Sequence, residues 1–359
     1  MITTHPSIML GSYVLDEDRL PRDEFDIRLA PLREAMTREG HAATLIYGDA
    51  KEHEALAFFT NFIPRMRWAM AMIPAKGEPR LLISISSRDM PAMKAMTWIA
   101  DVKSGWEWKW FEDHVAKLPA PGTLATINLD MMTPLLFGQL SKSLDGVFTL
   151  AEADHVASKA REKHRPREIA MIGAAAKIGD AAGNAIAERW RAGDDVENAA
   201  LAGERLARAM AAQDVRTLVS RDGGLTLEPY RARFDDRPKA LLAYVAVKYM
   251  GYWAEAFISL GGPAQKANTA LDDMLKRFKP GAPIAASAHP ALGGSAGHRI
   301  GLSLVEGPEL RAGAEALVAG VVYALRAGET DTGAGAVASA MVLRRGDGSF
   351  EILSRSVCA

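Results

Sequence analysis

The strongest constraint on the fold is the stretch REIAMIGAAAKIGDAAGNAIAERW, at positions 167–190, where apolar and small residues recur at helical spacing. The stripe that this spacing predicts along one helix consists of Ile169, Ile172, Ala176, Gly179, Gly183, Ile186 and Trp190. Gly193 ends this helix, and Asp194 with Glu197 forms a capping pair that opens a second one. We therefore expect two long helices in succession.

Strand patterns follow the two predicted helices. The apolar runs LLAYVAV and WAEAFISLGG precede a helical segment, NTALDDMLKRF, and a turn, KPGAP, at 279–283. The chain closes with ALVAGVVYAL, GAVASAMVLRR, a GDG turn and FEIL. Helices first and antiparallel-looking strands later are typical of an α+β domain, which we expect in the C-terminal part.

The first part of the chain alternates helix and strand signals. EFDIRLAPLREAMTREG, at 24–40, has helical spacing and a glycine at its end, and AATLIYG follows as a strand. WAMAMIP and RLLISIS flank an AKGEP turn and predict a hairpin, whereas WFEDHVAKL, TLATINL and PLLFGQLSKSL predict a helix, a strand and a helix. The charge-rich segment 151–167 marks the junction. We expect an α/β domain at 1–158 and the α+β domain at 159–359.

The composition, 48% hydrophobic and 24% charged, is that of a soluble globular protein, and the formal net charge is -1. So small a charge, with the basic residues spread along the chain, favours neither nucleic acid nor an anionic membrane as a partner. No stretch approaches ~20 uninterrupted apolar residues, and the N-terminus has no signal-peptide pattern. The single cysteine, Cys358, cannot form an internal disulfide, so we expect a cytoplasmic protein.

Several segments stand in the order of the motifs of one known superfamily. KHRPREIAMIGAAAKIGDAA, KYMGYWAEAFISLGG and GHRIGLSLVEGP resemble the KS-x-x-E-I helix, the GY-x-x-D/E strand and the GHGIG-x-x-x-HE-x-P loop of the creatinase/prolidase/aminopeptidase-P superfamily. FFTNFIPRMRW resembles its N-terminal YLTNF segment. The resemblance covers nearly the whole chain. It implies a creatinase-type α/β domain followed by a pita-bread α+β domain, in a homodimer with sites near the subunit interface.

The resemblance also implies metal ligands that this sequence has largely lost. Most members bind two divalent metals through two Asp, one His and two Glu, and hydrolyse peptide bonds next to proline or an N-terminal residue. The corresponding positions are Tyr244, Glu255, His298, at or near Ala319, and at or near Ser339. Two cations less than ~4 Å apart need several shared anionic oxygens, which one glutamate and one histidine cannot supply. We therefore expect no metal and no other cofactor.

Creatinase itself is a metal-free member that hydrolyses a C–N bond with a histidine as base. That histidine falls near Tyr230 in this chain, in TLEPYRARFDD. A phenol with a pKa near ~10 is a poor base at neutral pH unless a cation lowers it. The histidine of the HE pair in the superfamily's loop is replaced by Val305, so that Glu306 is the one residue of the pair that remains. These departures argue against a direct transfer of creatine hydrolysis.

The candidate catalytic residues are His298, Glu306, Glu255 and Tyr230. The ordinary pKa of a histidine such as His298 suits proton transfer near neutrality. One glutamate would orient the imidazole and the other would activate water, since paired carboxylates in a partly buried cleft take distinct roles. The structural alternatives are a histidine that only hydrogen-bonds within the fold, Glu255 at a strand end facing solvent, and Glu306 capping the turn at Gly307.

The candidate substrate-binding residues are Arg65, Arg67 and Tyr252. In a creatinase-like architecture, the N-terminal domain of one subunit reaches over the partner's site and can clamp a substrate carboxylate. Arginine suits this role because its planar fork binds a carboxylate bidentately. The alternatives are two arginines at a strand edge and a tyrosine that packs in the core with its hydroxyl bonded.

The function that these residues favour is a metal-independent, creatinase-like hydrolase or lyase of a small polar carboxylate or amide. One alternative is a metallopeptidase of the Xaa-Pro dipeptidase or aminopeptidase type with unusual ligands. The other is a non-catalytic protein that binds a peptide or metabolite. The expected partners are a small molecule or short peptide and a second copy of the chain.

Overall fold

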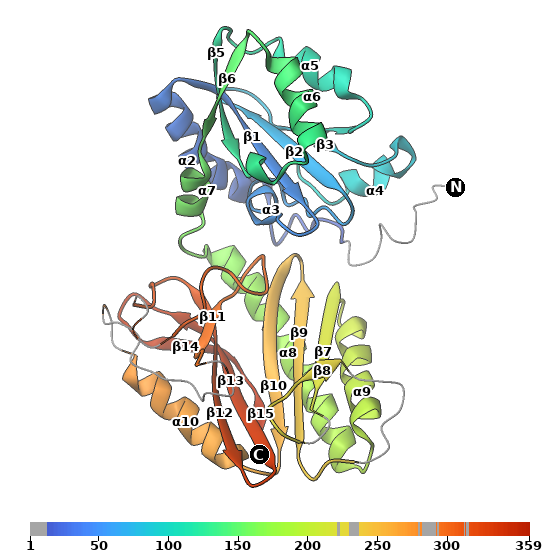
Figure 1. The fold of residues 1–359 in the computed structure, drawn as a ribbon, viewed down its shortest axis with the longest axis vertical. Coiled ribbons are helices and arrows are strands. Elements are labelled where there is room, and N and C mark those ends of the chain that lie inside the picture. Colours follow the sequence, from blue (N-terminus) through green and yellow to red (C-terminus); the bar gives the residue numbers. More distant parts are fainter. Residues whose placement is uncertain are drawn as a thin grey trace. The chain divides into compact units, whose positions relative to one another are not determined.

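The chain folds as two units, Met1–Glu162 and Lys163–Ala359 (Figure 1). Each unit has its own hydrophobic core. The computed structural model describes residues 13–220, 223–229, 237–278, 281, 292, 294–311, 313 and 316–359. Tyr230 and most of the KPGAP turn lie outside these residues. The helix and strand content of the two units confirms the mixed α/β and α+β class that the sequence predicts.

The first unit is built on one six-stranded sheet with the order β4-β3-β2-β1-β5-β6. Its strands are β1 (His41–Asp49), β2 (Trp68–Pro74), β3 (Arg80–Ile83), β4 (Asp101–Ser104), β5 (Gly122–Ile127) and β6 (Phe148–Glu152). The antiparallel pairing of β2 with β3 confirms the predicted hairpin. The sequence patterns did not predict the two edge strands, β4 and β6, because both are short and partly exposed.

Helices cover the sheet of the first unit and supply much of its core. They are α2 (Arg22–Glu39), α3 (Glu54–Thr60), α4 (Met90–Lys94), α5 (Trp108–Val115), α6 (Pro134–Leu144) and α7 (Asp154–Ala160). Side chains of α5 and α6 pack with those of β1, β2 and β5 in one cluster. Helix α7 occupies the segment predicted as a charge-rich junction, and it contributes the buried residues Val156 and Ala157.

Two long helices open the second unit, as the small-residue stripe predicts: α8 (Pro166–Arg191) and α9 (Val196–Ala209). Except for the half-buried Ile169, the predicted stripe is buried in α8. The predicted cap is wrong by one residue. Asp195 caps α9 by accepting a hydrogen bond from the backbone N–H of Asn198 at 2.8 Å, whereas Asp194 accepts one from Arg189 at 2.6 Å.

Two sheets complete the second unit, with the orders β15-β10-β9-β7-β8 and β11-β12-β13-β14. Their strands are β7 (Asp214–Val219), β8 (Glu228–Pro229), β9 (Leu241–Tyr249), β10 (Tyr252–Leu260), β11 (Gly297–Arg299), β12 (Val322–Asp331), β13 (Ala334–Arg344), β14 (Phe350–Arg355) and β15 (Val357–Cys358). Helix α10 (Ala264–Arg277) packs on β12 and β13, and α8 runs behind β9 and β10 (Figure 1).

Strand alternation gives β9 and β10 two different faces. Ala243, Val245, Val247, Ala256 and Ile258 pack in one core cluster with side chains of α8 and α9. The residues that alternate with these along the two strands, including Tyr244 and Glu255, therefore point away from the helices. The second unit thus presents polar side chains on the face of its sheet that the helices leave uncovered.

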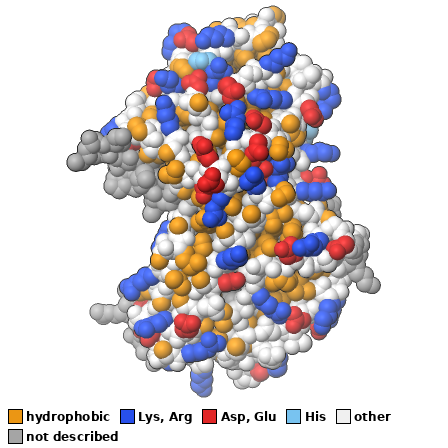
Figure 2. Space-filling model, turned by 180° about the vertical axis from the view of Figure 1, so that it is seen from behind, with side chains coloured by type: hydrophobic (Ala, Val, Ile, Leu, Met, Phe, Trp, Pro, Cys, Tyr) orange, Lys and Arg blue, Asp and Glu red, His pale blue; other side chains and the backbone are white. Residues whose placement is uncertain are grey.

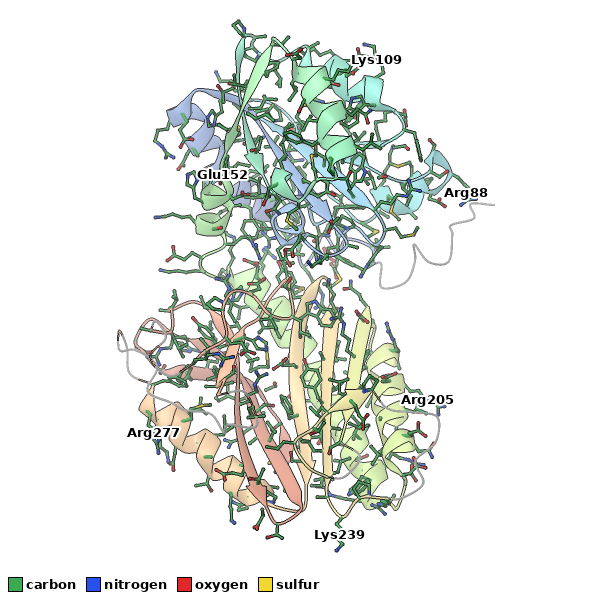
Figure 3. The ribbon with its side chains drawn as sticks, in the orientation of Figure 1. Arg88, Lys109, Glu152, Arg205, Lys239 and Arg277 are labelled. Atoms are coloured by element: carbon green, nitrogen blue, oxygen red, sulfur yellow. The ribbon has the colours of Figure 1, made fainter. Side chains whose placement is uncertain are left out.

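The surface is consistent with a charge near zero. Figure 2 shows Lys and Arg side chains interspersed with Asp and Glu on the face that it displays. Charged side chains at the ends of elements, such as Lys109 of α5 and Arg277 of α10, point outward (Figure 3). Among the described helices, none has both the length and the apolar character that crossing a bilayer requires.

Gly203 of α9 lets the two long helices approach closely. A Cβ atom at this position would lie 2.6 Å from Cγ1 of Ile186 and 2.9 Å from the carbonyl oxygen of Ala182. Overpacking of this kind costs about 1–3 kcal/mol, so we expect Gly203→Ala to lower the free energy of unfolding by about that amount in urea denaturation. Gly173→Ala is the control, because nothing lies within 4 Å of its Cβ position. Equal effects of the two substitutions would contradict this packing.

Candidate functional site

Glu255 and Tyr244 form the centre of a polar cluster on the inner face of the second unit. Glu255 lies in β10 opposite Ala246 of β9, and Tyr244 lies two residues before Ala246, so both side chains share one face. The Tyr244 hydroxyl donates a 2.7 Å hydrogen bond to Oε2 of Glu255. Glu255 is only 5% exposed. The alternative of a solvent-facing Glu255 is therefore wrong.

His298 enters the same cluster from β11. The preceding Gly297 has φ 139°, and a Cβ atom there would lie 2.0 Å from the carbonyl oxygen of Ala324. Only glycine allows β11 to approach β12 this closely. The approach brings Nε2 of His298 within 3.4 Å of Oε1 of Glu255, and its Nδ1 lies 3.1 Å from the carbonyl oxygen of Arg299. Both ring nitrogens thus face atoms that only accept hydrogen bonds, which favours the imidazolium form.

The charges of Glu255 and His298 stabilise each other. Burial alone would raise the pKa of the Glu255 carboxyl. The hydrogen bond and charge of His298, with the hydrogen bond of Tyr244 and the charge of Arg326, together outweigh burial, and the pKa is lowered. Burial alone would lower the pKa of His298, but the hydrogen bond and charge of Glu255 outweigh it, and the pKa is raised. Burial, and then the charge of Glu255, raises the pKa of Tyr244 well above its usual value. These directions favour an ion pair of Glu255 and His298 beside a neutral phenol.

Arg326 of β12 is the fourth member of this cluster. It lies opposite Ser339 of β13, and its charge lowers the pKa of Glu255, His298 and Tyr244 alike. Its Nη2 lies 3.3 Å from Oγ of Ser295. Sequence reasoning missed this residue. The available signal was a lone arginine within the apolar run VVYALRAGE.

Two positions that the resemblance assigned to glutamate ligands are occupied differently. Ala319, the nearest match to the first glutamate, lies in the turn before β12, and Arg326 is the residue of β12 that acts on the cluster. Ser339 lies in β13, where its hydroxyl accepts a 3.0 Å hydrogen bond from the backbone N–H of Phe257 in β10. Ser339 thus ties the two sheets of the second unit together.

Glu306 belongs to a second polar group. Arg299, the neighbour of His298, donates a 2.9 Å hydrogen bond to its Oε2, and the backbone N–H of Leu302 donates one of 2.9 Å to its Oε1. Successive side chains of a strand point to opposite faces, so His298 and Arg299 carry their partners on different sides of β11. The structure therefore joins Glu255 to His298, whereas Glu306 organises the turn 301–306.

His164 is a further residue that sequence reasoning set aside. It is 7% exposed, and its Nδ1 accepts a 2.9 Å hydrogen bond from the backbone N–H of Val322. Its Nε2 therefore carries the hydrogen of the neutral ring and lies 3.8 Å from Oε2 of Glu306. Gly301 makes room for this contact, because a Cβ atom there would lie 2.8 Å from Glu306 and 2.9 Å from His164. No local spacing connects His164 with Glu306, so no sequence signal was available.

Comparisons with known proteins agree with this architecture. Residues 28–163 match the family model of the creatinase/prolidase N-terminal domain. The prolidase from Pyrococcus horikoshii OT3 superposes with a TM-score of 0.72 at 16% identity, over 92% of this chain and 98% of that one. The X-Pro aminopeptidase from Thermotoga maritima MSB8 gives 0.70 at 21% identity, over 91% and 98%. The Xaa-Pro dipeptidase from Bacillus anthracis gives 0.68 at 16% identity, over 93% and 99%.

The chain has the creatinase/prolidase fold. This confirms the predicted superfamily resemblance and the predicted order of a creatinase-type domain and a pita-bread domain. No curated protein matches the sequence.

The residues at the positions where the resemblance implies metal ligands do not fit a divalent metal. Glu255 is the one carboxylate among them, both nitrogens of His298 face acceptors, Tyr244 keeps its proton, and Arg326 brings a positive charge. In the described part of the chain, no group of three His, Cys, Asp or Glu residues could hold a metal ion. Repulsion by Arg326 adds to the shortage of anionic ligands.

The structure does not bring Tyr252 into the cluster, and the other two candidate substrate-binding residues belong to the first unit. The buried Tyr252 hydroxyl donates a 3.2 Å hydrogen bond to Oε1 of Glu168 in the first turn of α8. Arg65 and Arg67 belong to the first unit, where the guanidinium of Arg67 lies 5.7 Å from the ring centroid of the exposed Trp106. Tyr230 lies outside the described residues.

The Glu255–His298 pair predicts a pH-dependent contribution to stability. The raised pKa of His298 increases the free energy of unfolding. This stabilisation is fully present below about the ordinary histidine pKa of 6.5, and it is lost as the pH rises through the pKa of the folded state. The lowered pKa of Glu255 also stabilises the folded state. This stabilisation is present above about the ordinary glutamate pKa of 4.5, and it is lost as the pH falls through the pKa of the folded state. We expect Glu255→Gln or His298→Gln to cost about 3–5 kcal/mol near pH 6, because each leaves a buried charge uncompensated.

A double-mutant cycle in urea, between about pH 5 and pH 9, measures the coupling between these two side chains. We expect the coupling to be largest near pH 6 and to fall toward pH 9. The exposed pair Arg345–Glu351 is the control, for which we expect less than about 1 kcal/mol at every pH. A coupling between Glu255 and His298 that is as small as the control would contradict the ion pair.

Proposed function

We propose that the protein is a metal-independent hydrolase that cleaves a C–N bond in a small polar carboxylate or amide substrate. The observation that carries this proposal is the buried, ionised Glu255–His298 pair, 3.4 Å apart, at positions where the resemblance implies metal ligands. Solved proteins with the same fold include prolidases and X-Pro aminopeptidases, which supports a hydrolase of C–N bonds as the broad class.

His298 and Glu255 divide the proton transfers of hydrolysis between them. Glu255 takes a proton from water as its oxygen adds to the carbonyl carbon, and Nε2 of His298 gives its proton to the departing nitrogen as the C–N bond breaks. The products are a carboxylic acid and an amine. The proton on Glu255 then passes to the neutral His298, which restores the ion pair across their 3.4 Å contact. Tyr244 holds the second oxygen of Glu255 during this cycle.

A non-catalytic binding protein is the second candidate. Both nitrogens of His298 and both oxygens of Glu255 already face partners within the protein. Groups held in this way fix a rigid, charged surface for a ligand without any proton transfer. Binding that stabilises the protein without turnover would favour this candidate.

The decisive experiment is a turnover assay on protein treated with a chelator, with N-acetylated amino acids, small amides and Xaa-Pro dipeptides as substrates. We expect one of these classes to be hydrolysed, and His298→Gln to lower kcat by about 100-fold or more, because the general acid is lost. The rate should fall as the pH rises through the raised pKa of His298 and as it falls through the lowered pKa of Glu255.

The matched control is His155→Gln, which changes an exposed histidine of the first unit. We expect it to leave turnover unchanged. Activity that disappears with the chelator and returns with manganese would show that the proposal is wrong. Full activity in the His298→Gln variant would also show this.

A further inference from the structure

Two arginines from different sheets approach Tyr244. Arg216 of β7 lies opposite Ala246 of β9, which in turn lies opposite Glu255, so Arg216 and Glu255 stand in one row across the sheet. Residues in one row share a face. Arg326 comes from β12 of the other sheet. The charges of both arginines lower the pKa of the Tyr244 hydroxyl, which burial and Glu255 raise.

Each arginine is held in place but keeps donors to spare. The guanidinium of Arg216 lies 4.5 Å from the ring centroid of Trp253, and its Nε lies 3.5 Å from Asp214. Nη2 of Arg326 lies 3.3 Å from Ser295 and 3.5 Å from Glu309. Within the described residues, Nε of Arg326 is buried without a hydrogen-bond partner. A guanidinium has five N–H donors, and contacts as long as 3.5 Å satisfy few of them.

The described charges around the two arginines have an excess of cations. Arg216 and Arg326 each have a carboxylate at 3.5 Å, Asp214 and Glu309. Each of these carboxylates also contacts a second arginine, Arg208 for Asp214 and Arg311 for Glu309. Cations therefore outnumber carboxylates among these side chains, which favours an anionic ligand.

We propose that Arg216 and Arg326 bind a carboxylate group of the substrate beside the Glu255–His298 pair. This inference rests on the function proposed above, whose substrate it makes specific: a small molecule with a free carboxylate. The planar forks of the two guanidinium groups suit the planar carboxylate. Arg326 also accounts for the poor fit of a metal, since its positive charge acts on Glu255 and His298, at two positions where the resemblance implies ligands.

The experiment is a titration of the full-length protein with propionate, followed by NMR shifts and calorimetry. Propionamide is the uncharged analogue, and inorganic phosphate and sulfate are the comparison anions. We expect propionate to bind with a Kd on the order of 1 mM, and more tightly than the other three ligands. Arg216→Gln and Arg326→Gln should each weaken propionate binding about tenfold or more, because each removes charge-assisted hydrogen bonds. Arg345→Gln, an exposed arginine of the same unit, should leave it unchanged.

Two results would overturn the inference. One is propionamide or phosphate binding at least as tightly as propionate. The other is unchanged propionate affinity in Arg216→Gln, which is decisive even if the Arg326→Gln variant fails to fold, since Arg216 is 57% exposed. The titration needs no turnover. Propionate binding through both arginines without hydrolysis of any substrate would therefore remove the proposed function, whereas the carboxylate site formed by the two arginines would remain.

Discussion

The arrangement of the second unit depends on one buried ion pair, between His298 and Glu255. Neither charge is stable alone in this position, because burial opposes ionisation of both side chains. Together they overcome this cost, and the phenol of Tyr244 and the carbonyl of Arg299 satisfy their remaining hydrogen-bonding atoms. A buried pair is stable only when its geometry is this complete. The pair therefore requires β9, β10 and β11 to stay in register.

Glycines and other small residues allow these strands and helices to pack closely. Gly297 lets β11 approach β12, and the small residues of α8 and α9 let both helices lie close to β9 and β10. The helices bury one face of this sheet. Since strand side chains alternate, the charged residues of β7, β9 and β10 gather on the other face. Packing on one side of the sheet thus determines the chemistry on the other.

Local patterns predict individual elements, such as the long helix that the stripe of α8 indicates. The fold and half of the cluster could be predicted from the resemblance, since its GYW and GHR motifs indicate Glu255 and His298. Arg326 could not be found in this way. It is a basic residue in an apolar strand, and only the pairing of β12 with β13 shows that it belongs to the cluster. His164 was missed for the same reason, since its contact with Glu306 joins distant parts of the chain.

In the metal-independent hydrolase proposed above, a guanidinium rather than a metal ion stands beside the Glu255–His298 pair, and this changes what the surrounding residues contribute. A divalent ion generates hydroxide from bound water near neutral pH. A guanidinium has no such effect, but it donates directed hydrogen bonds and remains charged at every physiological pH. In that proposal proton transfer comes from side chains, and His298 is the described residue of the cluster that gives the proton. Its raised pKa, which would be a disadvantage in a metal ligand, suits an acid that must stay protonated until the leaving group departs.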